Sequence, residues 1–382
     1  MIYIIAAILI FGVLIAVHEL GHFLAAKACG VRVNEFAIGM GPALFKKTRG
    51  DTTYALRLLP IGGFCAMEGE EEDSDDPAAL NNQGFWRKLL IFAAGALMNF
   101  LTGLVIILVL YAGVKAVNVP VIHGFADGCP LESASGLQVG DRILSIDGER
   151  IYTFSDVSLL LGRNKTGDFD LVIRRDGQKL RLENFHMERG EYLDQSGQKF
   201  TGFGLYFGAQ ELTFGGRLRY CWDQAVDFVR LVRLSLQMLI TGEAGFSDMS
   251  GPVGIVSTIT TVGEQSENAR AAAANIAYLA ALIAVNLAVM NLLPLPALDG
   301  GKIFFLVVNA LSLRIIRKQI PARFEITSIW PALSFSWAHA GHHLPRRHQA
   351  VSIAADRPGM GPASLPAPFR RPVRRILLAR RI

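Results

Sequence analysis

The chain has 382 residues, of which 51% are hydrophobic, and its mean hydropathy is positive. This apolar content is high for a soluble protein, and the length allows two domains or one domain plus a membrane bundle. The net charge of +5 does not indicate a nucleic-acid partner. Nine arginines, no lysine and one acid follow residue 325, so the rest of the chain is slightly acidic.

The four cysteines are widely scattered and form no C-x-x-C pair. They therefore predict neither a cysteine zinc site nor a disulfide framework. These residues are Cys29, Cys65, Cys129 and Cys221.

The first apolar stretch, residues 2–26, has no basic segment before it and no small-residue cleavage site. It therefore predicts a retained membrane span rather than a removable signal peptide. The span contains His18, Glu19 and His22 in the sequence His-Glu-Leu-Gly-His.

This motif has the spacing of a metal site. On a helix His18 and His22 share one face, where two imidazoles can hold zinc, and Glu19 can act as a base on water. The motif also occurs by chance, mostly on polar surface helices. Ionisable groups in an apolar span are costly unless they pair or bind a metal, which favours the zinc site.

A charged loop, residues 27–88, follows the span and carries eight basic side chains, whereas none precedes the span. The positive-inside rule places this loop in the cytoplasm and the N-terminus outside, so the motif lies near the cytoplasmic face. Residues 52–60 have strand-like composition, and Gly62-Gly63 is expected to end the strand. A hairpin or edge strand beside the metal site is therefore predicted.

A second span is predicted at residues 89–112 and contains Asn99. An asparagine in an apolar span needs a hydrogen-bond partner. Two interpretations remain open: a bond between helices, or a contact to an active-site strand or substrate.

Residues 117–212 predict a small β-rich domain between the spans. Two strand patterns each end in an Asp-Gly turn, at Asp147-Gly148 and Asp176-Gly177. The pattern resembles a PDZ domain, which binds peptides by strand addition. Residues 202–205, Gly-Phe-Gly-Leu, resemble its carboxylate-binding loop beside an edge strand.

Residues 215–241 form a basic, apolar amphipathic stretch that either lies on the membrane surface or packs on the bundle. A third span is predicted at residues 271–289. A segment with two prolines and two glycines follows, and another apolar segment, residues 303–313, continues from it.

Asp299 lies in this interrupted segment and is the candidate third ligand. A hydrolytic zinc site needs three protein ligands and one open position. Non-helical backbone at membrane depth is tolerated only where protein or a water-lined cavity receives it, so the segment is a site or a hinge. Asn291 either donates a hydrogen bond to a developing oxyanion or caps a helix.

Together, His-Glu-Leu-Gly-His in the first span, a PDZ-like insert, and the run from Asn291 to Gly301 resemble the site-2 protease family, peptidase family M50. The nearest branch is the bacterial intramembrane zinc metalloproteases of the sigma-E regulator type. Gly95 to Asn99 and Pro60 to Phe64 also match that family.

The resemblance implies a multi-pass α-helical protein of the inner membrane with an inserted β-rich PDZ-like domain, which would be extracytoplasmic. Zn²⁺ would be held by His18, His22 and Asp299, with Glu19 as general base. Asn99, Asn291, Gly62 and Gly63 would contact the substrate.

The substrate would be a membrane-spanning helix, unwound locally before water attacks. Cleaved anti-sigma factors and signal-peptide remnants are the expected partners in the bilayer, and peptide C-termini would bind the PDZ-like domain. The expected parts are residues 1–116, 117–212, 213–325 and 326–382.

The last part departs from the family, which normally ends with one more transmembrane helix. Residues 326–382 are rich in arginine, proline and histidine, with no apolar run of the ~20 residues a span requires. We expect a disordered tail or one produced by a frameshift. A membrane-bound PDZ adaptor with an inactive catalytic half is the alternative function.

Overall fold

The computed structural model describes residues 2–70, 72–164, 166–193, 199–242, 251–315 and 317. The atypical tail expected at residues 326–382 lies outside these residues. The chain divides into two units. Of the described residues, those up to 107 and those from 228 to 317 belong to the first unit, and those from 108 to 227 belong to the second.

Three helices of the described chain are long and apolar enough to cross a membrane: α1 (Ile2–Ala28), α2 (Phe85–Tyr111) and α6 (Ala269–Asn291). They confirm the three predicted helices, each within four residues of its expected start. Two shorter helices accompany them, α5 (Pro252–Glu264) and α7 (Asp299–Ile315). Multiple apolar helices of this length indicate a multi-pass membrane protein.

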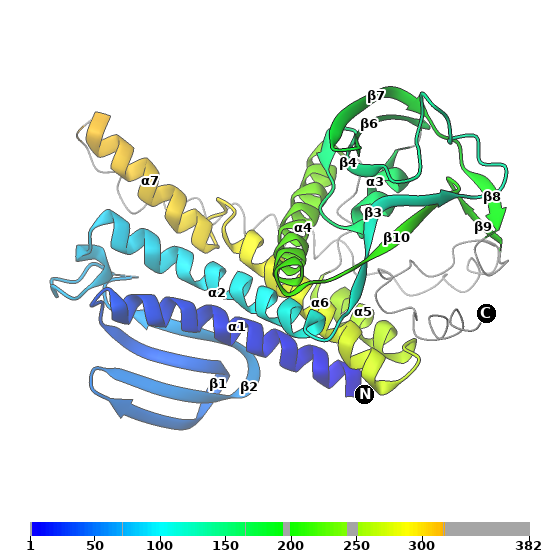
Figure 1. Cartoon of the computed structure of the whole chain (residues 1–382). Helices are drawn as coiled ribbons and strands as arrows, with labels where there is room; N and C mark the ends of the chain where they lie inside the picture. The colour runs from blue at the N-terminus through cyan, green and yellow to red at the C-terminus, as the bar shows by residue number, and fades with distance from the viewer. Residues whose placement is uncertain are drawn as a thin grey trace, which may run out of the picture. The chain divides into compact units, whose positions relative to one another are not determined.

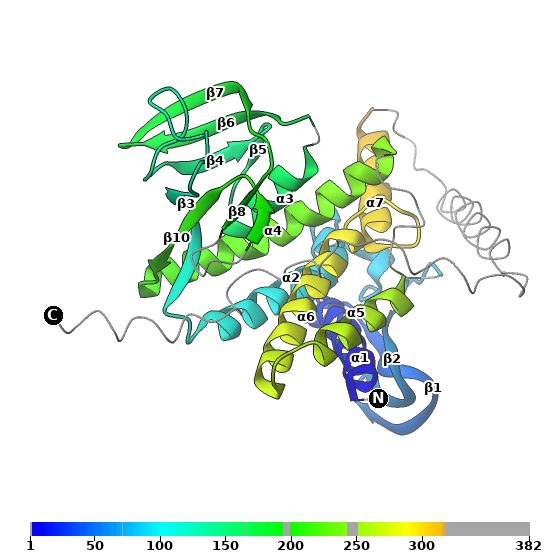
Figure 2. The same ribbon diagram turned by 90° about the vertical axis from the view of Figure 1, so that its right-hand side faces the viewer.

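Glycines allow the long helices to approach closely. A Cβ on Gly21 of α1 would collide with the carbonyl oxygen of Ala94 in α2. A Cβ on Gly103 of α2 would lie 3.0 Å from the carbonyl oxygen of Ala281 in α6. Helices in lipid associate through such close packing of small residues, so α2 holds both α1 and α6. Figures 1 and 2 both show α1, α2 and α6 side by side.

A β-sheet of two long strands, β1 (Val33–Arg49) and β2 (Thr52–Met67), packs against α1 (Figure 1). Because both strands bend, some residues of one strand pair with two residues of the other. Ala37 pairs with both Ala55 and Phe64, and Ala55 pairs with both Ala37 and Lys46. The segment around Ala55 is therefore inside the sheet.

Of the two predicted alternatives, a hairpin or an edge strand, the hairpin is confirmed, because β1 and β2 pair antiparallel on either side of residues 50–51. Two details of the strand predicted at residues 52–60 are wrong. Gly62-Gly63 does not end the strand, because β2 continues to Met67. A positive φ of 87° at Gly62 instead bends it, a conformation that glycine adopts without steric cost. Residues around Ala55 are also not an edge, since strands flank them on both sides. The segment from Gly63 to Met67 pairs with β1 on one side, and no strand of the described chain covers its other side.

The second unit contains a sheet in the order β10-β3-β4-β6-β7, with β5 paired to β4. Its strands are β3 (Ala116–Phe125), β4 (Arg142–Ile146), β5 (Glu149–Arg150), β6 (Asp168–Arg175), β7 (Gln178–His186) and β10 (Leu205–Glu211). Helix α3 (Phe154–Arg163) and the pair β8 (Gly190–Leu193) and β9 (Lys199–Gly202) complete it. Both predicted Asp-Gly turns are present, with positive φ at Asp147 and Asp176. A β-rich region between membrane helices is therefore confirmed.

Helix α4 (Phe214–Thr241) covers the predicted amphipathic stretch. Its Cys221, Ala225, Phe228 and Val232 are buried at spacings of three and four residues, as on one helical face. The Phe228 ring packs on Tyr278 of α6, with centroids 5.3 Å apart. This burial favours packing on protein over a helix lying free on the membrane surface.

Candidate metal centre

Asp299 reaches the face of α1 that carries His18 and His22 because the chain after α6 turns tightly. Asp299 is the first residue of α7. A Cβ on Gly300 would collide with the carbonyl oxygen of Leu293, and one on Gly301 with that of Leu295. Only glycine allows the first turn of α7 to fold against these residues.

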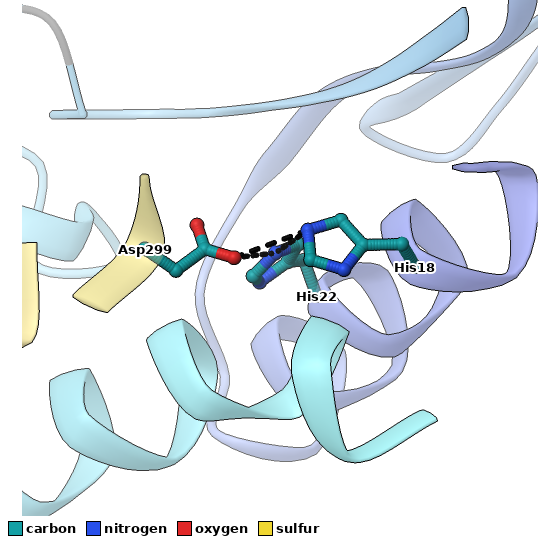
Figure 3. A group of neighbouring side chains, drawn as sticks. All are labelled: His18, His22 and Asp299. Atoms are coloured by element: carbon teal, nitrogen blue, oxygen red, sulfur yellow. Dashed lines mark hydrogen bonds and ion pairs between the residues drawn. The ribbon is translucent and has the colours of Figure 1, made fainter. Parts of the chain in front are cut away.

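The three side chains converge on one point (Figure 3). Asp299 Oδ2 lies 3.1 Å from His18 Nε2 and 3.2 Å from His22 Nε2, and the two Nε2 atoms are 3.2 Å apart. Tetrahedral ligands at zinc bond lengths lie about 3.3 Å from each other. These three atoms could therefore share one ion, and nitrogen and carboxylate oxygen are ligands that zinc accepts.

Each imidazole has a second contact that orients it. His22 Nδ1 donates to the carbonyl oxygen of Ile91 at 2.8 Å, which leaves the Nε2 lone pair directed at the site. The amide nitrogen of Asn291 lies 3.4 Å from His18 Nδ1. Such outer contacts set the tautomer and ring orientation of metal-binding histidines.

Gly95 of α2 provides the space that the imidazoles occupy. A Cβ at this position would lie 2.6 Å from His18 Cε1 and would collide with His22 Nε2. The absence of a side chain at Gly95 therefore allows both rings to stand between α1 and α2.

Glu19 lies at the same site. It is close enough to His18, His22 and Asp299 for their charges to interact. A Cβ built on Gly63 of β2 would come within 3.5 Å of Glu19 Cγ, so the edge segment of β2 runs beside this carboxylate.

Lys302 adds a link between α7 and the segment after β2. Its Nζ donates to Glu70 Oε1 at 2.7 Å. Lys302 follows Asp299 by three residues and so shares its side of the helix. The ion pair helps to hold the helix that carries Asp299.

Asn99 lies one turn beyond Gly95 on α2 and is 1% exposed. Neither its amide nitrogen nor its amide oxygen has a hydrogen-bond partner among the described residues. A buried amide without a hydrogen-bond partner is costly to the free energy of folding. The bond between helices, one of the two interpretations, is not formed.

The structure thus brings together His18, Glu19, His22, Asp299, Asn291 and Gly63. Gly62 instead shapes the bend in β2, where a Cβ would meet the Met40 side chain. Asn291 is the last residue of α6 rather than an N-terminal cap, and its amide faces His18. Sequence reasoning missed the Ile91 carbonyl, which carries no sequence signal, and the Lys302–Glu70 pair, which only the fold juxtaposes.

Comparison with known proteins agrees with this geometry. The model of peptidase family M50 matches residues 6–329. The chain belongs to peptidase family M50. As a member it is a zinc metalloprotease, and the resemblance to site-2 proteases is confirmed.

Three relatives illustrate the match. A Clostridium perfringens protein, named as a candidate zinc metalloprotease, is 37% identical over 84% of this chain and 91% of its own length. The regulator of sigma-W protease RasP of Bacillus subtilis is 27% identical over 83% of this chain and 92% of its own. The zinc metalloprotease RasP of Shouchella clausii is 29% identical over 80% and 90%.

The space at Gly95 gives a direct test of the centre. We expect Gly95→Ala to lower zinc affinity at least tenfold, because the methyl group would displace both imidazoles. Alanine favours the helix, so the fold should persist. Zinc per chain is measured by elemental analysis of purified protein after dialysis against a weak chelator.

Gly84→Ala is the matched control, since a Cβ there meets no atom within 4 Å. Unchanged zinc content in Gly95→Ala would show that the imidazoles do not bind the ion in this arrangement.

Proposed function

We propose that this M50 protease cleaves transmembrane segments of membrane proteins within the bilayer, with zinc held by His18, His22 and Asp299. The observation that carries the proposal is the convergence of these ligands among helices long enough to span a membrane, although His22 and Asp299 are 277 residues apart in sequence. Their assembly also favours the enzyme over the alternative of an adaptor with an inactive catalytic half.

Glu19 is the general base in this proposal. Zinc, when bound, supplies Lewis-acid chemistry, acidifying water and polarising the substrate carbonyl. Glu19 accepts a proton from the attacking water and passes it to the leaving amine nitrogen. The Ile91 carbonyl accepts a hydrogen bond from His22 Nδ1 and so keeps His22 in the tautomer whose Nε2 is free to bind the metal.

The open edge of β2 is the proposed guide for the substrate. A transmembrane helix satisfies its own amides and must be unwound before water can attack. Residues 63–66 form a strand edge beside Glu19 that no other strand of the described chain covers, and an opened segment can add there as a strand. The unpartnered Asn99 amide is available to a freed backbone group of the same segment.

We propose that the protein lies in the bacterial inner membrane, with residues 27–88 in the cytoplasm and residues 117–212 outside. The charge of the first loop supports this orientation. Anti-sigma factors already cut by another protease and signal-peptide remnants remain the proposed substrates. The name of the Bacillus subtilis relative, regulator of sigma-W protease, is consistent with the first class.

The β-rich unit is proposed to bind peptide C-termini in PDZ fashion. A cavity of about 290 Å³ lies between α3 and the β9–β10 region. It is lined by Phe203 and Leu205 of the expected carboxylate loop, and β10 is an edge strand. Such a groove can accept a strand and an apolar terminal side chain.

The catalytic assignment predicts that Glu19→Gln abolishes cleavage and keeps zinc, because the amide cannot take the proton and is not among the three ligand atoms. The assay reconstitutes the full chain in liposomes with a transmembrane substrate and follows cleavage and zinc content. His18→Ala, the comparison variant, should lose both. Chelator-sensitive cleavage by Glu19→Gln would refute the role of Glu19.

Variants of Asn291 distinguish two roles of this residue, orienting His18 and donating a hydrogen bond to the oxyanion. With a metal on Nε2, His18 Nδ1 carries a proton, and a half-turn of the Asn291 amide presents its oxygen as acceptor. We therefore expect Asn291→Ala to weaken zinc affinity about tenfold or more and Asn291→Asp to preserve it. If kcat falls at saturating zinc with affinity unchanged, Asn291 serves the oxyanion instead.

Peptide binding by the β-rich unit predicts an effect at Ser158, an exposed residue that lines the groove. Ser158→Lys should weaken binding of a fluorescent peptide with an apolar C-terminus about tenfold, because the long side chain fills the cavity. Fluorescence polarisation with the full chain measures this change. Leu159→Lys is the control, since Leu159 is exposed and does not line the groove; equal binding by both variants and wild type would refute this groove.

A further inference from the structure

A second and larger cavity of the β-rich unit lies between the face of the sheet and the start of α4. Its volume is about 750 Å³. Five basic and two acidic side chains line it, so its surface charge is positive. The zinc chemistry proposed above makes no use of this cavity.

Three of the basic residues form a ladder across neighbouring strands. Arg142 of β4 is directly opposite Arg174 of β6, and Arg174 is directly opposite Lys179 of β7. Both views show β4, β6 and β7 side by side (Figures 1 and 2). Residues directly opposite share one face of a sheet, and all three line the cavity.

Like charges placed directly opposite each other destabilise a sheet. No carboxylate of the described chain forms an ion pair with Arg142, Arg174 or Lys179. Two acids line the cavity. Asp223 Oδ2 lies 3.7 Å from Arg219 Nε, and Glu211 is on β10, the strand at the opposite edge of the sheet from β7. The ladder is therefore an arrangement that an external anion would stabilise.

The start of α4 adds to the positive potential. Thr213 precedes the helix, and its Oγ1 accepts the backbone N–H of Gly216 at 3.1 Å. Thr213 and Gly216 both line the cavity. The N-terminal end of this long helix carries a partial positive charge, so it favours a negative group in the same space.

The cavity lies at the end of a membrane span. Tyr220 lines it and packs on Tyr111, the last residue of α2, with ring centroids 5.0 Å apart. Arg217 Nη2 also donates to the carbonyl oxygen of Val114, just after that span. Tyrosines typically mark the level of lipid headgroups at the end of a span, so phosphate groups of the bilayer surround this position.

We propose that this cavity binds the phosphate headgroup of an anionic phospholipid of the bilayer that α2 crosses. The guanidinium groups of Arg142 and Arg174 suit phosphate oxygens, and Lys179 adds a point charge. The bound lipid fixes the β-rich unit at the membrane surface. The three basic residues of the ladder thereby gain an ion-pair partner, which no carboxylate of the described chain provides.

The test uses the full-length chain in nanodiscs of phosphatidylcholine, with or without phosphatidylglycerol. After transfer into detergent, native mass spectrometry counts phosphatidylglycerol molecules retained per chain. Wild type should retain this lipid. Each of Arg142→Gln, Arg174→Gln and Lys179→Gln should lower the amount of retained phosphatidylglycerol about fivefold, and the triple variant should retain none.

Arg181→Gln is the matched control, since Arg181 is on the same sheet, pairs with Glu183 at 3.2 Å, and does not line the cavity. Arg174→Lys keeps the charge and should retain most of the lipid. The single variants keep the test decisive if the triple variant misfolds.

Equal retention by the wild type and the three single variants would overturn the proposal. Inorganic phosphate or an acidic peptide that binds wild type at this ladder while phosphatidylglycerol does not would overturn it too, because the source of the anion would then not be the bilayer.

Discussion

The convergence of one carboxylate and two imidazoles among apolar helices is the constraint on which the first unit depends. Groups of this kind are costly in a membrane unless they pair or bind an ion. Their Nε2 and Oδ2 atoms lie within 3.2 Å of one another, which requires α1 and α7 to meet at one point. Several features follow from this requirement: a glycine in α2 opposite the rings, two glycines at the start of α7, and a carbonyl that fixes His22.

In the proposed function, the β1–β2 sheet connects the metal centre to the substrate. A site for hydrolysis of a transmembrane segment needs water and an opened backbone, which the bilayer disfavours. The strand edge at residues 63–66 is covered by no other strand of the described chain, and Gly63 on this edge lies beside Glu19. The metal ligands and this edge segment thus lie at one place in the fold, and the segment follows the bend of β2 at Gly62.

Much of the first unit could be predicted because its signals are local. Long apolar runs indicate α1, α2 and α6, and the spacing of His18 and His22 places both on one face. Asp299 was predicted from the break in a helix, which is also local. The hairpin at residues 52–60 was predicted correctly, but its alternative, an edge strand, was wrong. The double pairing of Ala55 depends on how the two strands bend and meet, which is a non-local property. The Ile91 carbonyl and the Lys302–Glu70 pair likewise depend on tertiary contacts, and the site roles themselves stay predictions.

The central claim is that His18, His22 and Asp299 bind zinc through two nitrogens and one carboxylate oxygen. X-ray absorption at the zinc K-edge of the purified full-length chain tests it most directly. We predict two nitrogen ligands at ~2.0 Å and oxygen ligands at ~2.0–2.2 Å from the zinc ion. The signal of this ligand shell should be lost in Asp299→Ala. Sulfur ligands near ~2.3 Å, or an unchanged spectrum in Asp299→Ala, would contradict the claim.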